Sequence, residues 1–163
     1  MTPPDPDIQI HFTQNGCGQY HLSAAQWVNA PIERVFDFFQ RPGNLEKLTP
    51  EAQKMRIQTP VPEIMEAGTE ITYHLKVKGI PLKWVARIES MDAPHEFVDT
   101  QLKGPYRKWH HRHMFESQDG GTLVRDEVDY AAPVCRFGHR FFIKPQLVKI
   151  FEDRGQKIKK LFS

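Results

Sequence analysis

The stretch that decides the fold covers residues 106–130 and reads YRKWHHRHMFESQDGGTLVRDEVDY. At its centre stands Asp119-Gly120, and Asp-Gly between alternating strands favours a two-residue type I′ hairpin turn, whose central residues both need positive φ. With these two residues in the turn, Gln118 pairs with Gly121. Counting outward predicts four further pairs: Phe115 with Val124, His113 with Asp126, His111 with Val128, and Trp109 with Tyr130.

Alternation along the first strand of this hairpin separates an inner from an outer face. One parity contains Arg107, Trp109, His111, His113 and Phe115, and the other contains Lys108, His110, Arg112 and Met114. The large aromatic residues place the first parity on the dry face. We therefore expect His111 and His113 inside and His110 in solvent. On the second strand the parity Arg125, Glu127 and Asp129 is charged throughout, so Val124, Asp126, Val128 and Tyr130 are predicted to point inward.

The strand before this hairpin, HEFVDTQL at residues 95–102, is placed by the turn KGPYR at 103–107. A three-residue loop pairs Phe97 with His113, Asp99 with His111 and Gln101 with Trp109. A two-residue loop would reverse the parity and turn Asp99 outward. The first register is preferred because it places Phe97 on the inner face. The inner wall then carries several polar side chains, which must either satisfy one another or line a cavity, since an unsatisfied buried polar group costs roughly 1–3 kcal/mol.

Further strands and helices follow from the hydrophobic periodicity. A first strand is predicted at 19–31, then a helix opened by Pro31 and a second short helix at 44–49. Alternation of period two predicts strands at 70–79 and 82–91, joined by a turn at Gly79–Pro81. From Cys135 to Phe162 the pattern is helical, with Pro145 marking a kink or a fresh start. The predicted apolar stripe of this last helix consists of Phe137, Phe141, Val148, Phe151, Ile158 and Phe162, and Gly155 is expected to leave space above the sheet.

These elements predict an α+β fold: a curved antiparallel sheet of about six to seven strands, covered by one long C-terminal helix. The 163 residues suit one domain, placed at 16–163 after a flexible segment at 1–15. A net charge of +2 with acids and bases interspersed argues against a nucleic-acid partner, and no apolar run is long enough to insert stably in a membrane. Two unpaired cysteines, Cys17 and Cys135, suggest a cytoplasmic protein, expected as a monomer or weak homodimer.

The chain resembles the SRPBCC superfamily, which includes START, Bet v 1-like and polyketide cyclase/dehydrase-like proteins. The resemblance rests on APIERVFDFFQRPGNLEKLTP at 30–50, GIPLKW at 79–84, FVDTQLKGPYRKWHHRHMF at 97–115, GGTLVRDEVDY at 120–130 and IFEDR at 150–154. It implies a helix-grip fold with a deep cavity between the sheet and the C-terminal helix. Members bind lipids, polyketides, hormones and other small hydrophobic molecules, and no cofactor is expected.

The leading hypothesis is a carrier that binds a small hydrophobic or amphipathic molecule with a polar head. The cavity is expected to be closed by the last helix and the loop at 60–68. Arg154 could reach its mouth and suit an acidic head, or could be exposed beside Glu51 or Asp153. The predicted ligand-binding residues are Tyr73, Trp84, Phe97, Asp99, Gln101, Trp109, Phe115, Phe151 and Arg154.

Two other classes remain open. A cofactor-free cyclase or dehydratase would use His111 or His113 with Asp126 as general base and Tyr130 as acid. A protein-interaction module would instead have a filled core and an exposed apolar patch. A metal site built on His111 and His113 with Asp99 or Asp126 is conceivable, but each histidine already has a carboxylate neighbour, so we expect no metal.

Overall fold

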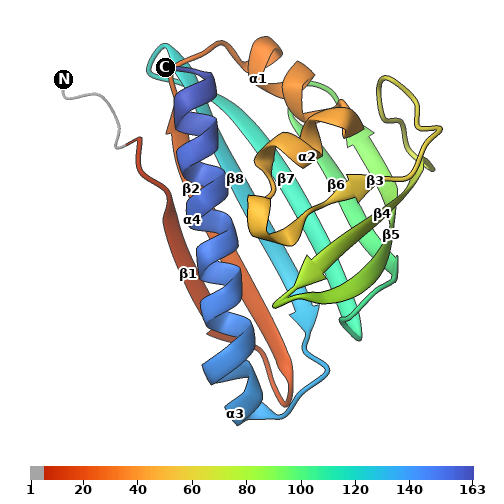
Figure 1. The fold of residues 1–163 in the computed structure, drawn as a ribbon. Coiled ribbons are helices and arrows are strands. Elements are labelled where there is room, and N and C mark those ends of the chain that lie inside the picture. Colours follow the sequence, from red (N-terminus) through yellow and green to blue (C-terminus); the bar gives the residue numbers. More distant parts are fainter. Residues whose placement is uncertain (1–5) are drawn as a thin grey trace.

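The computed structural model describes residues 6–163 and shows one curved antiparallel sheet with a long helix across it (Figure 1). The spatial order of the strands is β1-β2-β8-β7-β6-β5-β4-β3. Their bounds are β1 (Gln9–Gln14), β2 (Gln19–Val28), β3 (Arg56–Ile57), β4 (Glu70–Val77), β5 (Ile80–Asp92), β6 (Glu96–Lys103), β7 (Lys108–Gln118) and β8 (Gly121–Ala131). The predicted α+β architecture is confirmed, with eight strands among the described residues in place of six to seven.

Helices cover one face of the sheet. The long helix α4 (Lys144–Leu161) contacts β2 and α2 (Leu45–Leu48), while α1 (Ile32–Phe39) packs on β7 and β8. Shorter helical segments are the 3-10 turns at Pro42–Asn44 and Glu51–Gln53, α3 (Arg136–Gly138), and a π-helical turn at His139–Ile143. None of the helices in residues 6–163 is long and apolar enough to cross a membrane.

The N-terminal segment departs from the prediction. Residues 9–14, expected to be flexible, form the edge strand β1, which pairs antiparallel with β2. Ile10 and Phe12 of β1 pack against the core beside β2 and α4. The alternation of apolar residues in this strand is short and lies among polar residues, so the sequence did not indicate a strand here. Residues 1–5 of the predicted flexible segment lie outside the described residues.

The central hairpin has the predicted register. Gln118 pairs with Gly121, His113 with Asp126 and Trp109 with Tyr130, around a turn with φ of +50° at Asp119 and +79° at Gly120. The β4–β5 turn lies one residue earlier than predicted, at Lys78-Gly79, where both residues also have positive φ. Asp99 pairs with His111 and Phe97 with His113, as the three-residue loop predicts, although the ladder ends at Thr100 and leaves Gln101 outside it.

The C-terminal helix buries a different stripe from the one predicted. Leu147, Phe151, Gly155 and Ile158 are the buried residues of α4, and Phe162 is buried just after it. Phe137 and Phe141 are exposed, and Val148 is half-buried, so these three assignments were wrong. The π-helical turn at His139–Ile143 advances the helix by a different angle per residue, so α3 and α4 do not share one stripe. Residues 136–161 are helical without a break, and Pro145 comes just after the π-helical turn, so the fresh start that was one of the two expectations was wrong.

Gly155 does not face free space above the sheet. A Cβ placed on it would lie 2.9 Å from Cγ2 of Ile8, and its carbonyl accepts a hydrogen bond of 2.9 Å from the Gln26 side chain. The glycine therefore permits close packing of α4 against Ile8 and β2, and the predicted role as a spacer in the cavity was wrong.

Candidate functional site

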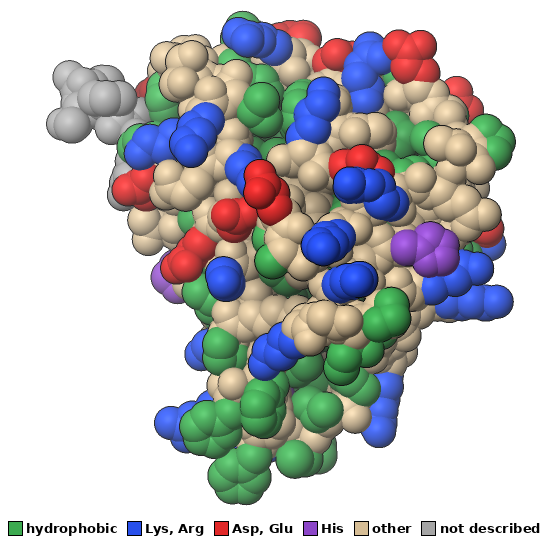
Figure 2. Space-filling model, viewed as in Figure 1, with side chains coloured by type: hydrophobic (Ala, Val, Ile, Leu, Met, Phe, Trp, Pro, Cys, Tyr) green, Lys and Arg blue, Asp and Glu red, His purple; other side chains and the backbone are tan. Residues whose placement is uncertain are grey.

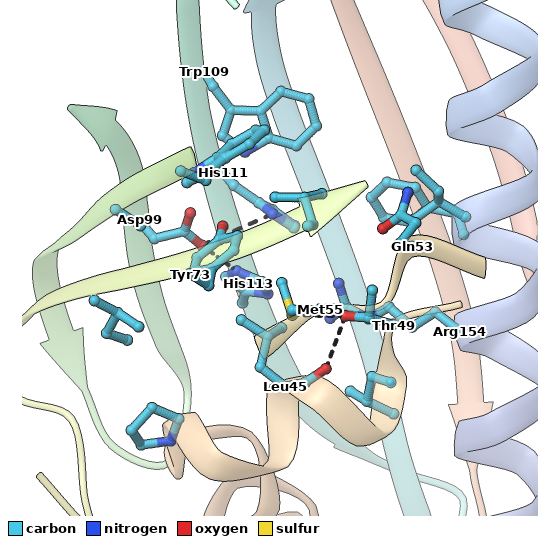
Figure 3. A pocket seen from close by; sticks show the side chains of 18 of the residues that line it. Leu45, Thr49, Gln53, Met55, Tyr73, Asp99, Trp109, His111, His113 and Arg154 are labelled. Atoms are coloured by element: carbon cyan, nitrogen blue, oxygen red, sulfur yellow. Dashed lines mark hydrogen bonds and ion pairs between the residues drawn. The ribbon is translucent and has the colours of Figure 1, made fainter. Parts of the chain in front are cut away.

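A cavity of about 260 Å³ lies between the sheet and α4 (Figure 3). Most of its lining is apolar and comes from β4, β5, β7, the helices α1 and α2, and α4. The loop at 60–68, which was predicted to help close it, contributes Met65. Apolar lining residues include Phe39, Leu45, Leu48, Met55, Met65, Ile71, Leu75, Trp84, Ala86, Ile88, Trp109, Ile143, Leu147 and Phe151.

Two histidines and two carboxylates form a hydrogen-bonded cluster in the wall of this cavity. His111 Nε2 donates to Oδ1 of Asp126 over 2.8 Å, and His113 Nε2 donates to Oδ2 of Asp99 over 2.6 Å. His113 Nδ1 lies 3.1 Å from the same Asp126 oxygen, and His111 Nδ1 lies 3.9 Å from Asp99 Oδ2. The cluster arises because alternate residues of β6, β7 and β8 point to one face, and the hairpin register brings them level.

The imidazole rings of the cluster are stacked. The centroids of His111 and His113 are 3.7 Å apart, and Phe97 stacks on His113 at 4.2 Å. Two imidazolium ions at this separation would repel each other strongly in a buried environment. We therefore expect one proton in excess on the pair, not two.

Arg154 completes the cluster from α4. Its Nη2 lies 3.3 Å from Oδ1 of Asp126, and its guanidinium lies 5.3 Å from the ring centroid of Phe39 and 5.8 Å from that of Phe151. The side chain is only 12% exposed, so of the two expectations the inward one is confirmed and the exposed one was wrong. The inward arginine contacts a carboxylate of the wall itself, however, and does not stand free for an acidic ligand.

A carboxylate oxygen lies beside each ring nitrogen of His113, which favours the doubly protonated ring, and the directions of the pKa shifts agree. Burial alone would raise the pKa of Asp126, but the charge of Arg154 and the hydrogen bonds of both histidines hold it well below its usual range. Burial opposes ionisation of Asp99 too, yet its bond to His113 keeps that pKa low. Burial would lower the pKa of His113, but the carboxylates of Asp126 and Asp99 raise it. Burial and the neighbouring His113 lower the pKa of His111, which is therefore the neutral ring.

With His113 protonated and His111 neutral, the cluster carries no net charge. Asp99 and Asp126 contribute two negative charges, and Arg154 and protonated His113 contribute two positive charges. Neutrality and mutual hydrogen bonding allow these charged groups to lie beside apolar side chains, where an unpaired charge would be very costly.

Most of the predicted ligand-binding residues line the cavity, but two do not. Tyr73, Trp84, Phe97, Asp99, Trp109, Phe151 and Arg154 all contribute to the lining. Phe115 instead packs between Phe36 and Phe39 in the core beside it. Gln101 closes the β6–β7 loop, donating to the Tyr106 carbonyl over 2.7 Å and accepting from the Tyr106 N–H over 3.2 Å.

Tyr130 is placed away from the histidine pair. Its hydroxyl is hydrogen-bonded to Nε2 of His139 over 2.7 Å, and Tyr20 stacks on that imidazole at 3.4 Å. The residue therefore serves a second buried cluster that anchors the turn at His139–Ile143 to the sheet. Strand register placed Tyr130 correctly on the inner face opposite Trp109, but it could not show that the hydroxyl is bonded to His139.

Several lining residues were missed. Leu45, Thr49, Gln53 and Met55 come from the short helices after α1, and Tyr106 and Ile143 come from segments whose orientation the sequence left open. Of these residues, only Tyr106 had a signal in the sequence, because it belongs to the same GPYRKW string as Trp109. In the structure, burial raises the pKa of Tyr106. Trp84 Nε1 and Arg154 Nε are buried donors with no hydrogen-bond partner among residues 6–163.

Asp99, His111 and His113 also present ligand atoms within 4.8 Å of one another, which is compatible with a metal site. Asp126 would hold the far side of both rings, as carboxylates do behind metal-bound histidines. A metal would have to replace the proton between Asp99 and His113, however, and break their bond of 2.6 Å. The expectation of a metal-free site remains a prediction.

Comparison with known proteins shows to which family the chain belongs. The family model described as polyketide cyclase / dehydrase and lipid transport matches residues 28–159. The chain belongs to this SRPBCC family. The matched range contains the sheet from β3 to β8 and nearly all of α4. No curated protein sequence matched the chain significantly.

Solved structures share the fold across most of this SRPBCC chain. Protein Ms6760 from Mycobacterium smegmatis superposes with a TM-score of 0.67 at 16% identity, covering 94% of this chain and 97% of that one. Ginseng major latex-like protein 151 from Panax ginseng gives 0.68 at 10% identity, covering 89% and 98%. A nucleoside-diphosphate sugar epimerase from Corynebacterium glutamicum gives 0.63 at 26% identity, covering 85% of this chain but 28% of the epimerase.

Proposed function

We propose that this protein binds one small, largely apolar molecule with a neutral polar end in the cavity between the sheet and α4. The observation that carries the proposal is the cavity itself: about 260 Å³ lined mainly by apolar side chains, with a few polar groups gathered on one wall. Binding sites for small molecules commonly combine such a lining with a few placed polar groups. Family membership supports the same class of function.

The polar end of the ligand is inferred from the polar groups that the wall offers. Arg154 is already in contact with Asp126, and the cluster is neutral as a whole, so an anionic head would have no unpaired positive charge to meet. Trp84 Nε1 and Arg154 Nε are buried N–H groups that lack a partner among the described residues, and both residues line the cavity. A carbonyl or hydroxyl oxygen would accept from such donors and relieve the cost of burying them unpaired.

Displacement of an environment-sensitive fluorescent dye tests this proposal. Matched ligands that differ only at the head, a long-chain alcohol, the methyl ketone and the carboxylate, should separate a neutral from an acidic site. We expect the alcohol and the ketone to displace the dye at lower concentration than the carboxylate. Stronger displacement by the carboxylate would contradict the neutral head.

A cavity-filling variant locates the binding. Ala86 lines the cavity from β5, and Ala86→Leu should weaken ligand binding by about tenfold, because extra methylenes in a closely packed site cost about 1–3 kcal/mol. Ala25→Leu is the matched control, since Ala25 lies on β2 and does not contribute to the lining. Equal binding by the wild type and both variants would place the ligand elsewhere.

A second candidate is cofactor-free aldol cyclisation or dehydration, favoured because His111, His113 and Asp99 all line the same cavity. The predicted acid Tyr130 is bonded to His139, so Tyr73, which lies beside Asp99 in Figure 3, is the better-placed hydroxyl. A small acyclic diketone, whose intramolecular aldol reaction and loss of water give an ultraviolet-absorbing enone, provides the assay. Turnover in the wild type and its loss in His113→Asn would favour the enzyme, and equal background rates would exclude it for this substrate class.

A further inference from the structure

One end of the molecule exposes a group of aromatic side chains that packing leaves uncovered. Phe137, Phe141 and Phe142 are 73%, 62% and 59% exposed, and Val134 is 41% exposed. We call these four residues the aromatic tip. Figure 2 shows hydrophobic side chains gathered at the lower end of the molecule, where α3 begins. Clustered exposed aromatic residues of this kind mark interaction surfaces in soluble proteins.

The aromatic tip is held outward by a buried anchor. His139, between Phe137 and Phe141, is 5% exposed, stacks on Tyr20 at 3.4 Å and is hydrogen-bonded to Tyr130 over 2.7 Å. The π-helical turn at His139–Ile143 then directs Phe141 and Phe142 away from the sheet. Their exposure is thus built into a structured segment.

The segments around the tip carry only positive formal charge. Antiparallel pairing brings the β4–β5 turn, the β6–β7 loop and the segment after β8 to the same end of the sheet. Residues 76–83, 102–108 and 133–144 contain nine lysines and arginines and neither aspartate nor glutamate. The nine are Lys76, Lys78, Lys83, Lys103, Arg107, Lys108, Arg136, Arg140 and Lys144.

Acidic residues concentrate toward the opposite end. This end carries Glu89 and Asp92 near the end of β5 and Glu96 at the start of β6. It also carries Glu116 near the end of β7 and Asp119 in the β7–β8 turn. Basic residues also lie at that end, where Arg112 pairs with Glu96 and Arg125 pairs with Glu116. The segments around the tip therefore differ from the opposite end by lacking acids, and the net charge of +2 conceals this difference. Figure 2 shows lysines and arginines without acidic side chains around the tip, and both signs of charge over the upper part of the same face.

Apolar and cationic groups are interleaved at this end. Lys78 Nζ lies 4.9 Å from the ring centroid of Phe142, and the guanidinium of Arg140 lies 5.7 Å from that of Phe141. Rings with long cationic side chains beside them match a bilayer interface, where rings enter the boundary of headgroups and acyl chains while the cations meet anionic headgroups. Because all nine charges are of one sign, a surface of negative charge is the complementary partner.

Residues at the same end of the molecule also line the cavity. Ile143, from the π-helical turn, lines the cavity, and so do Pro105 and Tyr106 from the β6–β7 loop. A membrane at this end would therefore lie next to the part of the cavity that these residues form.

From these observations we infer that the aromatic tip and its nine surrounding cations form a surface that docks reversibly on anionic phospholipid bilayers. The inference concerns the outer surface and holds whether or not the cavity binds the proposed ligand. A flat or convex bilayer suits a protruding set of side chains, and no helix in residues 6–163 is able to span the membrane, so the docking is peripheral.

Vesicle co-sedimentation tests the inference with the full chain. We expect binding to phosphatidylcholine vesicles that contain phosphatidylglycerol, and much weaker binding to phosphatidylcholine alone. Arg140→Glu with Lys144→Glu should reduce partitioning by at least about tenfold, since each basic residue near an anionic surface contributes about fivefold. Raised salt should reduce it too, because the attraction is screened.

Matched controls come from other parts of the same structure. Lys159→Glu with Lys160→Glu removes two exposed cations at the far end of α4, and binding should stay within about twofold of the wild type, because charges far from the membrane are screened. Phe141→Ser with Phe142→Ser should abolish most binding, whereas Ile64→Ser with Leu161→Ser, also exposed apolar residues, should not. Circular dichroism confirms that each variant is folded.

Three results would overturn the inference. One is absence of binding to anionic vesicles, and the second is equal binding by the tip variants and their controls. The third is concentration-dependent self-association in analytical ultracentrifugation that Phe141→Ser with Phe142→Ser removes, without vesicle binding, which would assign the tip to a second copy of the chain. Dye displacement from the cavity, measured without vesicles, tests the proposed function separately.

Discussion

Replacing Asp126 by asparagine should destabilise the protein far more than its small change in shape suggests. The side chain is 6% exposed and faces three groups: His111 Nε2 at 2.8 Å, His113 Nδ1 at 3.1 Å and Arg154 Nη2 at 3.3 Å. An asparagine at this position would keep the volume and one acceptor oxygen but leave the arginine without a counter-charge. Breaking a buried ionic pair by removing one partner costs about 3–5 kcal/mol. Because an acceptor remains, we expect a loss at the lower end of that range, about 3 kcal/mol in the free energy of unfolding.

Asp129→Asn is the matched control on the same strand. Asp129 also lies 2.8 Å from a histidine, His21 Nδ1, but its side chain is 46% exposed, and an exposed pair contributes at most about 1 kcal/mol. Urea unfolding at pH 7, followed by tryptophan fluorescence, compares the two variants with the wild type. The pKa of Asp126 is lowered in the folded state, so its stabilisation is present above the unfolded value of about 3.9 and is lost as the pH falls through the folded value. Equal losses for the two variants at pH 7 would refute the buried-cluster reasoning.

Three further outcomes follow from the cluster and from α4. The stacked pair His111 and His113 should titrate in two steps, one with apparent pKa above about 6.5 and one below it, since the carboxylates favour the first proton and stacking opposes the second. The step with the raised pKa stabilises the fold fully below about pH 6.5, and this stabilisation is lost as the pH rises through the folded pKa. The step with the lowered pKa opposes folding as the pH falls below about 6.5. Carbon-proton correlation spectra of the imidazoles measure both steps, and a single shared midpoint would contradict the assignment. Protein purified without metal-affinity resin should contain no stoichiometric zinc by plasma mass spectrometry; zinc retained by the wild type and lost in His111→Ala would show that the ligand atoms do hold a metal. Gly155→Leu should lower the free energy of unfolding by about 1–3 kcal/mol, measured in urea, because its side chain would overlap Ile8; loss of dye displacement with unchanged stability would instead return Gly155 to the cavity.

The sheet and the histidine cluster were predictable because one turn fixes their register. The Asp119-Gly120 signal sets every pair along β7 and β8, and alternation then decides which side chains face inward. The choice between two loop lengths before β7 was settled by a single residue, Phe97, whose inward position requires Asp99 to face His111. Alternation along each strand, together with the register of the turns, was thus enough to predict contacts between residues on different strands.

The buried stripe of the C-terminal helix was harder to predict, because any departure from the ideal angle per residue changes which face every later residue occupies. A π-helical turn between α3 and α4 shifts the phase, so Phe137 and Phe141 are exposed although their spacing from Phe151 looked suitable. No residue pattern marks such a turn in advance. Tyr130 shows the corresponding limit for strands, since parity gives the face of a residue but not its partner, and here the partner is His139 on the C-terminal segment.

The arrangement of Arg154 explains how charged residues can lie in the wall of an apolar cavity. Asp126 bridges the two histidines to the arginine, and Asp99 holds the outer side of His113, so each charge has an opposite neighbour within 3.3 Å. The wall is consequently polar in chemistry but neutral in charge. A neutral wall attracts no particular ion from solution, and under the proposed function it would discriminate ligands by where an oxygen atom can accept from Trp84 or Arg154. Removing the arginine's charge would leave two carboxylates facing one protonated histidine, and the cavity with this net negative charge would then favour cationic heads over neutral ones.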